Sequence, residues 1–404
     1  MEIALNRSQK FLGKNGLVFL VFLINMTAPM STDMYLPAFP TLINEFHTTA
    51  SMLSYTLVGF FISFALGMLF IGPLSDKLGR KTILIAGVLV YGLFSLCCSF
   101  AQNIEQLILF RILQAIGGGG MVAVSMAIVK DAFSDDERPQ IIALLQMLGA
   151  FAPTVAPIIG AQIIEHFSWR ETFDVLALIS LLTLTLSILL EETLPQNQRL
   201  NANVFQTIYS LKDVLVKKPF MIFLFSMTGP TFIYLGFLAL SSYIYIDWFG
   251  LSKTTYSIFF AINSLVLIVG PRTYIFFHKK LNAKQIIRYS FALIFLSAVL
   301  LLTVGHTSPY VFLICFFPIT FSNGFLRSFA TNVLLGQENM NAGGAASIIN
   351  FMNTAMGALG MVIATLGWNN VVQGIGAVAL IGVLFSIILW RIFLVQKMSL
   401  KGIE

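Results

Sequence analysis

Long apolar segments follow one another along the whole chain, separated by short stretches that hold charges, Gly, Pro or Asn. They cover residues 17–40, 51–74, 82–101, 105–129, 140–164, 172–190, 219–245, 255–277, 286–305, 309–335, 345–366 and 371–394. Each is long enough to cross a bilayer core of roughly 30 Å as an α-helix, and none alternates polar and apolar residues as a membrane β-strand does. The pattern predicts an all-α integral membrane protein with twelve transmembrane helices.

Composition excludes the soluble classes of protein. Charged residues make up only 10% of the 404 residues, while 57% are hydrophobic. A soluble domain carries about 25% charged residues, so the chain lacks the charged surface that a soluble enzyme or a nucleic-acid-binding module needs. The sequence has no G-x-x-x-x-G-K-[ST] phosphate loop, and its four His and three Cys residues show no metal-ligand spacing. We therefore expect no catalytic site, no metal and no cofactor.

The Lys and Arg residues gather in alternate connections between the apolar segments. If the N-terminus is cytoplasmic, almost all 24 of them, Arg7 and Lys279 included, lie in cytoplasmic segments or at the inner ends of spans. The exceptions are Arg111, Arg170, Lys253 and Arg327. Because Lys and Arg are enriched in cytoplasmic loops, both termini are predicted to be cytoplasmic, in the inner (cytoplasmic) membrane of a cell. The same bias explains the net charge of +6, so no nucleic-acid partner is expected.

The longest connection divides the chain into two halves. Residues 191–218 form a predicted cytoplasmic linker between an N-terminal six-helix bundle, residues 1–190, and a C-terminal six-helix bundle, residues 219–404. The basic segment after the second span, residues 74–81, has a weaker counterpart after the eighth span, residues 277–284. A motif that recurs six spans later is typical of two parallel repeats. The prediction is two pseudo-symmetric bundles that work by alternating access.

The segment Gly72-Pro73-Leu74-Ser75-Asp76-Lys77-Leu78-Gly79-Arg80-Lys81 connects the second and third spans. Here Gly72 would permit close helix approach, Gly79 would suit a tight turn, and Asp76 could face a helix N-terminus. Arg80 could pair with an acid at a neighbouring helix end, such as Asp131. The segment resembles the G-x-L-x-D-x-x-G-R-K pattern of the major facilitator superfamily, and the resemblance implies a cytoplasmic gate. The alternative is a solvated basic loop.

Two further spans carry stretches that resemble motifs of the same superfamily. Arg111-Ile112-Leu113-Gln114-Ala115 in the fourth span is similar to R-x-x-Q-G, with Ala115 where Gly is usual. The fifth span has small residues with the spacing of the antiporter pattern G-x8-G-x3-G-P-x2-G-G. They are Ala143, Ala152, Ala156, Pro157, Gly160 and Ala161, with Ala at four of the five glycine positions. The resemblance implies an antiporter; the alternative is a plain helix-packing face.

The stretch from Ser31 to Pro40 is similar to the start of Bcr/CflA-type drug resistance transporters, as are Tyr243 to Asn263 and Gly344 to Ser347. That group consists of proton-driven exporters of drugs or metabolites. Members with two acidic residues in the first span carry the second one eight positions before the first. This chain has Asn25 there, so a second proton site is not expected.

Asp33 and Arg111 are the charges within spans that most need an explanation, because a charge at the bilayer centre costs about 3 kcal/mol on insertion scales. Each is expected about seven residues from the outer end of its span, and the first and fourth spans line the cavity in the superfamily's fold. Burial and a nearby cation act in opposite directions on the pKa of a carboxyl group. The pair is therefore predicted to couple transport to protons; the alternative is a fixed structural ion pair.

Other polar and aromatic residues within spans are candidate cargo contacts: Asn25, Met30, Tyr35, Tyr55, Gln114, Tyr234, Asn263, Arg327, Asn350 and Asn353. For the amides, interhelical hydrogen bonds are an equal alternative. Arg327 could bind an anionic group of the cargo, or could snorkel or pair at a helix end. Trp248 and Trp368 are expected near the outer interface as part of an aromatic belt.

Taken together, the sequence predicts a secondary transporter, driven by a proton gradient, that exports small amphipathic organic compounds. One alternative is a dedicated exporter of an anionic metabolite, such as a metallophore or amino-acid derivative, with Arg111 and Arg327 binding its carboxylate. Import by proton symport and a transporter-like receptor are weaker alternatives. The expected partners are protons, one small molecule and the lipid bilayer, with the chain acting as a monomer.

Overall fold

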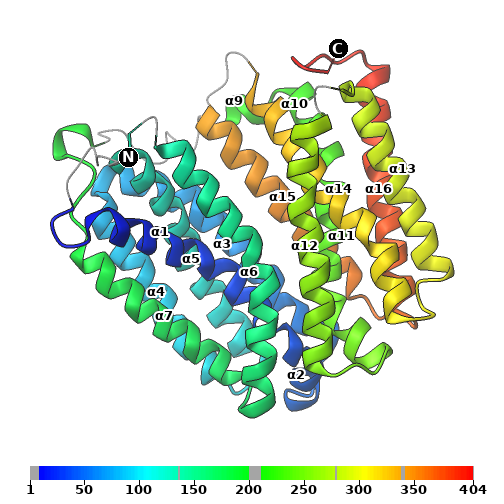
Figure 1. Cartoon of the computed structure of the whole chain (residues 1–404), viewed down its shortest axis with the longest axis horizontal. Helices are drawn as coiled ribbons and strands as arrows, with labels where there is room; N and C mark the ends of the chain where they lie inside the picture. Colours follow the sequence, from blue (N-terminus) through cyan, green and yellow to red (C-terminus); the bar gives the residue numbers. More distant parts are fainter. Residues whose placement is uncertain (1–8, 135–136, 200–210, 278–279, 338–341, 404) are drawn as a thin grey trace. The chain divides into compact units, whose positions relative to one another are not determined.

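The computed structural model describes residues 9–134, 137–199, 211–277, 280–337 and 342–403. Arg7, Lys279 and residues 200–210 of the expected linker lie outside the described residues. The regular elements of the described residues are helices, as the pattern of apolar segments predicts (Figure 1).

By their internal contacts, the helices form two compact units. The first comprises Met1–Ala38 and Tyr55–Tyr209, and the second comprises Phe39–Ser54 and Ser210–Glu404. The segment Phe39–Ser54 therefore packs with the C-terminal helices, although it follows the first span in the sequence. Figure 1 draws the helices of the first unit in blue to green and those of the second mostly in green to red.

The first unit is built from the first six long helices and two short turns. They are α1 (Gly13–Asp33), η1 (Leu36–Ala38), α3 (Ala50–Leu78, from Tyr55 onward), α4 (Arg80–Ser99), α5 (Ile104–Ala132), α6 (Arg138–His166), α7 (Arg170–Leu189) and η2 (Gln196–Gln198). Within this unit α4 packs against α5 and α7, and α1 packs against α5, α6 and α7. This arrangement brings α1 and α5, which carry Asp33 and Arg111, into one bundle.

The second unit holds the remaining helices. They are α2 (Phe39–Glu45), α9 (Lys212–Leu215), α10 (Lys218–Met227), α11 (Gly229–Ser242), the π-helical turn η3 (Tyr243–Trp248), α12 (Lys253–Phe277), α13 (Ala283–Thr303), α14 (Pro309–Leu335), α15 (Ala342–Ala364) and α16 (Val371–Val395). Here α11 packs against α15 and α16, and α12 packs against α14.

Among the described residues, eleven helices or joined helices are long and apolar enough to cross a membrane. The remaining expected span, residues 140–164, falls within α6, which is 29 residues long. Several side chains of α6, at positions 139, 143 and 146–150, lie outside the described residues. The predicted all-α membrane fold is confirmed.

The first span is not one continuous helix, although the joined helices Gly13–Glu45 contain the whole expected segment 17–40. The helix α1 ends at Asp33, and the chain passes through the 3₁₀ turn η1 before α2 begins at Phe39. Pro37 and Pro40 explain the break, because a proline has no N–H to donate to the carbonyl four residues earlier and clashes with it. For Pro37 that carbonyl belongs to Asp33. Asp33 is the last residue of α1 but still lies inside this joined span, which continues to Glu45.

The seventh span is interrupted for the same reason. Its first part, α10, ends at Met227, and α11 starts at Gly229 with Pro230 at its second position. A proline is tolerated there because the N–H that it lacks would have no partner within the helix. The span ends in η3, a π-helical turn. Such turns are rare and often occur at functional sites.

The two units use equivalent close contacts between helices. In the first unit Gly119 of α5 lies against the backbone of Phe64 in α3, and a Cβ at this glycine would overlap the Phe64 carbonyl. In the second unit Gly324 of α14 lies in the same way against the backbone of Leu267 in α12. Small residues allow membrane helices to approach closely, so the same device recurs in both bundles.

Candidate functional site

The guanidinium group of Arg111 is buried in a cage of aromatic rings within the first unit. Arg111 has no exposed surface. Its Cζ atom lies 4.1 Å from the ring centroid of Phe60, 5.0 Å from that of Tyr35 and 5.7 Å from that of Phe173. An aromatic ring face attracts a cation at these distances, so the cage replaces part of the hydration that Arg111 loses on burial.

Hydrogen bonds of Arg111 satisfy only part of its guanidinium. Nη1 donates to Oε1 of Gln114, one helical turn further along α5, at 2.6 Å. Gln114 in turn donates from Nε2 to Oγ of Ser95 in α4 at 2.7 Å. The Nε and Nη2 groups of Arg111 are buried and have no hydrogen-bond partner among the described residues. Because an unsatisfied buried donor costs free energy, these two groups are suited to bind an acceptor that the chain itself does not provide.

A short polar chain continues from this arginine to α1. Ser95 donates to the backbone carbonyl of Tyr91 at 2.7 Å, and the Tyr91 hydroxyl lies 2.5 Å from Oγ of Ser31. Ser31 stands two residues before Asp33 on α1. Two sets of hydrogen bonds thus meet at Tyr91: its backbone carbonyl is linked through Ser95 and Gln114 to Arg111, and its hydroxyl is linked to the last turn of α1.

Asp33 is buried at the C-terminal end of α1, with 4% of its surface exposed. Its Oδ1 atom lies 2.7 Å from the hydroxyl of Thr32. Of the carboxyl groups that the structure describes within the spans, only Asp33 is buried. No ion pair joins Asp33 to Arg111 within the described part of the chain, so the alternative of a fixed ion pair is wrong. The two charges lie in one unit without a direct ion pair between them.

The helix α6 packs against this end of α1 through a face of small residues. Ala152, Ala156 and Gly160, spaced four residues apart, are all buried, as is Pro157. A Cβ added to Gly160 would overlap the backbone carbonyl of Met34, the residue that follows Asp33. The packing face expected for this stretch is therefore present. The one glycine kept from the antiporter pattern stands where helix backbones touch beside Asp33.

Arg80 forms the pair that the sequence predicts at the other end of the same unit. Its Nε atom lies 2.9 Å from Oδ2 of Asp131, at the end of α5, which confirms the expected pairing. Its Nη1 atom lies 2.6 Å from Oδ1 of Asp76 and 2.6 Å from Oγ of Ser75, both on α3. One side chain thereby links the ends of three helices.

Two details of this motif differ from expectation. The carboxylate that accepts from the first N–H of α4 belongs to Glu192, at 3.0 Å from the nitrogen of Arg80, and not to Asp76. Glu192 also pairs with Arg199 at 3.6 Å. The expectation that Gly72 permits close helix approach is wrong. A Cβ at this position would lie 3.7 Å from Ala123, which is an ordinary contact distance. The turn at Gly79 is confirmed by its φ of 102°.

Several predicted cargo contacts are engaged in bonds between helices of one unit. Asn25 donates to Ser125 at 3.1 Å, Asn263 accepts from Thr320 at 2.8 Å and Asn353 accepts from Thr231 at 3.2 Å. Tyr35 lies 2.8 Å from the Thr56 hydroxyl. For these three Asn residues, as for Gln114, the structure shows the interhelical bond that was the alternative to cargo binding.

The remaining candidates keep more accessible surface, with one exception. Tyr55 is 40% exposed, Arg327 and Asn350 are exposed, and Met30 is half-buried. Tyr234 is buried. No ion pair holds Arg327 among the residues that the structure describes. Arg327 on α14 is thus an exposed charge within an apolar span.

Comparison with known proteins agrees with this architecture. A family model described as the Major Facilitator Superfamily matches residues 21–365. The chain belongs to the major facilitator superfamily. It is a membrane transporter and not an enzyme.

This transporter has relatives over most of its length. It is 28% identical over 352 residues to the MFS-type transporter YdgK of Bacillus subtilis (strain 168), covering 85% of this chain and 87% of that protein. It is 27% identical over 372 residues to a bicyclomycin resistance protein homolog of Haemophilus influenzae, covering 87% and 90%. Among solved structures it resembles an inward-facing bacterial homolog of the human lysosomal transporter Spinster, with a TM-score of 0.75 at 13% identity and 95% and 97% coverage.

Sequence reasoning missed part of the transporter's polar and aromatic network. Phe60 and Phe173 of the Arg111 cage lie among many phenylalanines that look alike in an apolar helix. Ser95 and Tyr91 likewise give no signal in one sequence. Glu192 could have been found, because an acidic pair directly after the sixth span is well placed to meet the basic segment after the second.

Proposed function

We propose that this transporter exports small amphipathic organic compounds in exchange for protons. The proposal includes a location in the cytoplasmic membrane, with both termini in the cytoplasm, because that orientation assigns nearly all Lys and Arg residues to the inner side. It needs a proton gradient, one cargo molecule and the lipid bilayer. It involves no cofactor and one chain.

The observation that carries the proposal is the burial of Asp33 in the same unit as a caged arginine with which it forms no ion pair. Gain or loss of one proton at this carboxyl group changes the net charge of the buried site by one unit. Arg111 offers its free Nε and Nη2 groups to an acceptor in the same unit. Protonation of Asp33 from outside would remove the negative charge that attracts positively charged cargo, and its deprotonation on the inner side would restore that attraction.

The packing around Asp33 supports a coupling between its charge and helix position. Met34 stands directly against Gly160 of α6, and the Ser31–Tyr91 bond holds the last turn of α1 to α4. Packed interfaces have discrete arrangements, so a small shift at the end of α1 is passed to α6 and α4. That is the mechanical requirement for alternating access driven by one proton.

Export of drug-like cargo is supported by sequence similarity to a resistance protein. The bicyclomycin resistance protein homolog that matches 87% of this chain is named for resistance to an antibiotic. A protein of the same superfamily with a similar apolar bundle is expected to take compounds of that kind, namely small organic molecules with both polar and apolar groups.

Transport by the purified protein in liposomes tests the proposal. A pH gradient is imposed, and internal proton and cargo concentrations are followed with ethidium as a cation, chloramphenicol as a neutral compound and p-aminohippurate as an anion. We expect ethidium or chloramphenicol to move against the proton gradient. Asp33→Asn should abolish this coupled movement, because its side chain cannot exchange a proton.

The matched control is Asp174→Asn, which removes an exposed carboxyl group on α7 and should leave transport unchanged. All variants must elute as the unmodified chain does in gel filtration. Coupled transport by Asp33→Asn at the unmodified rate would contradict the assignment of Asp33. Failure of every compound to exchange with protons would contradict antiport itself.

A second candidate function rests on Arg327, an exposed cation on α14 with no ion pair in the described part of the chain. It would suit a dedicated exporter of an anionic metabolite, because an exposed guanidinium binds carboxylates well. In the same liposomes, this function predicts exchange of p-aminohippurate alone, with loss of that exchange in Arg327→Gln.

A further inference from the structure

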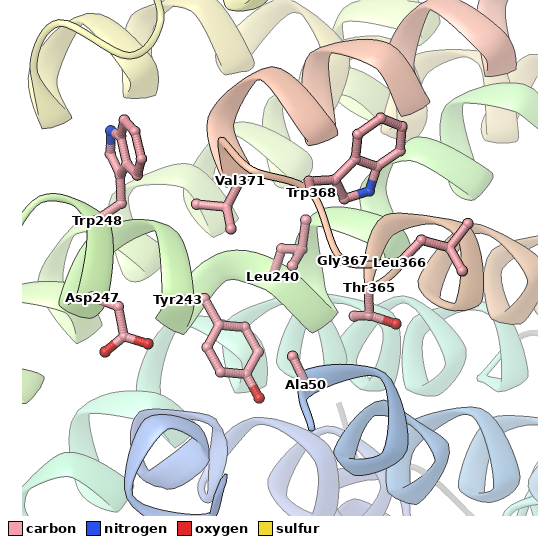
Figure 2. A pocket seen from close by; sticks show the side chains of 10 residues that line it. All are labelled: Ala50, Leu240, Tyr243, Asp247, Trp248, Thr365, Leu366, Gly367, Trp368 and Val371. Carbon is pink, nitrogen blue, oxygen red and sulfur yellow. The ribbon is translucent and has the colours of Figure 1, made fainter. Parts of the chain in front are cut away.

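The second unit contains a cavity that none of the predicted site residues explains. Its volume is about 270 Å³, and its walls come from η3, from the connection between α15 and α16, and from the start of α3. Figure 2 shows Asp247 and Trp248 at one side and Thr365 and Trp368 at the other, with Leu240 and Tyr243 between them. All of these residues belong to the second unit.

Among the described residues that line the cavity, Asp247 alone carries a charge. Asp247 is exposed and forms no ion pair among the described residues. Its neighbours in the wall are aromatic: Trp248, Tyr243 and Trp368. Aromatic ring faces and a carboxylate both attract a cation, and neither favours an anion. The lining therefore selects for positive charge combined with an apolar body.

The cavity is held in shape before any ligand arrives. The Thr365 hydroxyl donates to Oγ of Ser54 at 2.9 Å, and the Tyr243 ring packs on that of Phe39, with centroids 6.0 Å apart. The indole N–H of Trp368 donates to the carbonyl of Ile363 at 3.2 Å, which fixes the plane of its ring. Since these walls are fixed by bonds within the unit, binding a ligand costs little ordering of the protein.

The position of the cavity follows from the chain direction. It lies at the end of the α10–α11–η3 span opposite Lys218, where α15 ends and α16 begins. In the proposed orientation this is the outer end of the transporter. The aromatic belt expected for Trp248 and Trp368 explains aromatic rings at this level but not the carboxylate of Asp247 on the same side of the cavity as Trp248.

We propose that this cavity is an outer binding site for small organic cations with an aromatic or aliphatic group, which cargo occupies as it leaves. This inference rests on the proposed function only for the direction in which cargo moves. The binding of a cation at the cavity does not depend on that function. A quaternary ammonium compound of one ring matches both the charge and the volume of the cavity.

Saturation-transfer NMR titrations of the full chain in a non-ionic detergent test the site. The probes are benzyltrimethylammonium and phenylmethanesulfonate, which have similar shapes and opposite charges. The titrations use the Asp33→Asn background, so that binding which depends on Asp33 does not contribute. We expect the cation to bind and the anion not to. Asp247→Asn and Trp248→Leu should each weaken cation binding by about tenfold, because each removes one attraction for the cation.

Asp174→Asn, which changes an exposed carboxyl group of the first unit, serves as the matched control and should leave the affinity unchanged. Both cavity variants alter exposed side chains, so gel filtration should show intact protein. Equal affinity of the Asp247→Asn variant for the cation, or equal binding of the sulfonate, would overturn the proposal. If antiport fails in liposomes but the cation still binds, the proposed function is contradicted, while the assignment of the cavity as a cation site still holds.

The ammonium group of a lipid could also bind to the carboxylate and aromatic rings of the cavity. A second experiment distinguishes this lipid group from cargo. The protein is placed in nanodiscs of phosphatidylglycerol, with and without phosphatidylethanolamine, and titrated with benzyltrimethylammonium. We expect the same affinity in both. Loss of probe binding when phosphatidylethanolamine is present would assign the cavity to a lipid headgroup and overturn the proposal for cargo.

Discussion

Gly160 of α6 stands against the backbone carbonyl of Met34, the residue that follows Asp33 at the end of α1. No side chain separates the two backbones. The buried carboxyl group is therefore adjacent to the tightest contact between α1 and α6, and a change in either helix reaches the other directly. This contact also explains why this glycine is kept where the rest of the antiporter pattern has alanine.

Replacing Gly160 by alanine should force α6 away from α1. A Cβ at this position overlaps backbone, which cannot rotate aside, and overpacking of this kind costs about 1–3 kcal/mol. We expect a lower melting temperature in detergent and loss of proton-coupled transport in liposomes. Gly72→Ala is the matched control for stability, because it adds a Cβ to a helix at an ordinary contact distance of 3.7 Å from Ala123. Equal melting temperatures for the two variants would contradict the contact.

Arg111 should not be replaceable by lysine. The cage of Phe60, Tyr35 and Phe173 surrounds a planar group, and Nη1 holds Gln114 at 2.6 Å. A lysine keeps the positive charge but has no planar group to stack on the rings and cannot donate hydrogen bonds in the same geometry. Transport should therefore fall by about tenfold or more. Arg272→Lys, at an exposed position of α12, should have no effect on liposome transport.

The bond between Arg111 and Gln114 can be isolated with a double-mutant cycle. If Gln114 acts through Arg111, Gln114→Met and Arg111→Lys together should impair transport little more than Arg111→Lys alone. Strictly additive effects of the two changes would show that the residues act independently.

Asp131 and Asp76 both contact Arg80, but they should contribute unequally. The Asp131 side chain is 16% exposed and pairs with a buried guanidinium, so Asp131→Asn should lower stability by about 1–2 kcal/mol. Asp76 is 45% exposed, and water screens its pair with Arg80, so Asp76→Asn should cost at most about 0.5 kcal/mol. Thermal unfolding in detergent compares the two. A larger effect at Asp76 would contradict the role given to burial.

The two glycines of the same motif should also differ. Gly79 has a φ of 102°, a conformation that L-residues rarely adopt, so Gly79→Ala should destabilise the protein by about 1–3 kcal/mol. Gly72→Ala places its Cβ in ordinary contact with Ala123 and should be nearly neutral. The measurement is again the melting temperature, and a neutral Gly79→Ala would refute the turn geometry.

Much of the candidate site could be anticipated from local sequence, and the pairing of Arg80 with Asp131 is the best example. The charges lie at the ends of two predicted spans, where only a few partners are available. The burial of Asp33 and Arg111 could also be predicted, since both lie in apolar segments. What could not be predicted is that these two form no ion pair, because the distance between them depends on how α1 and α5 pack in the bundle.

The sequence alone determined the membrane class, the limits of most spans, the bias of basic residues and the motif segments. These depend on hydrophobicity, charge and backbone rules that act within about one helix length. Only the tertiary structure decided that Asn25 bonds Ser125 and that Asp247 lines the same cavity as Trp368. Those partners lie about one hundred residues apart, and helix packing, which no local pattern encodes, brings them together.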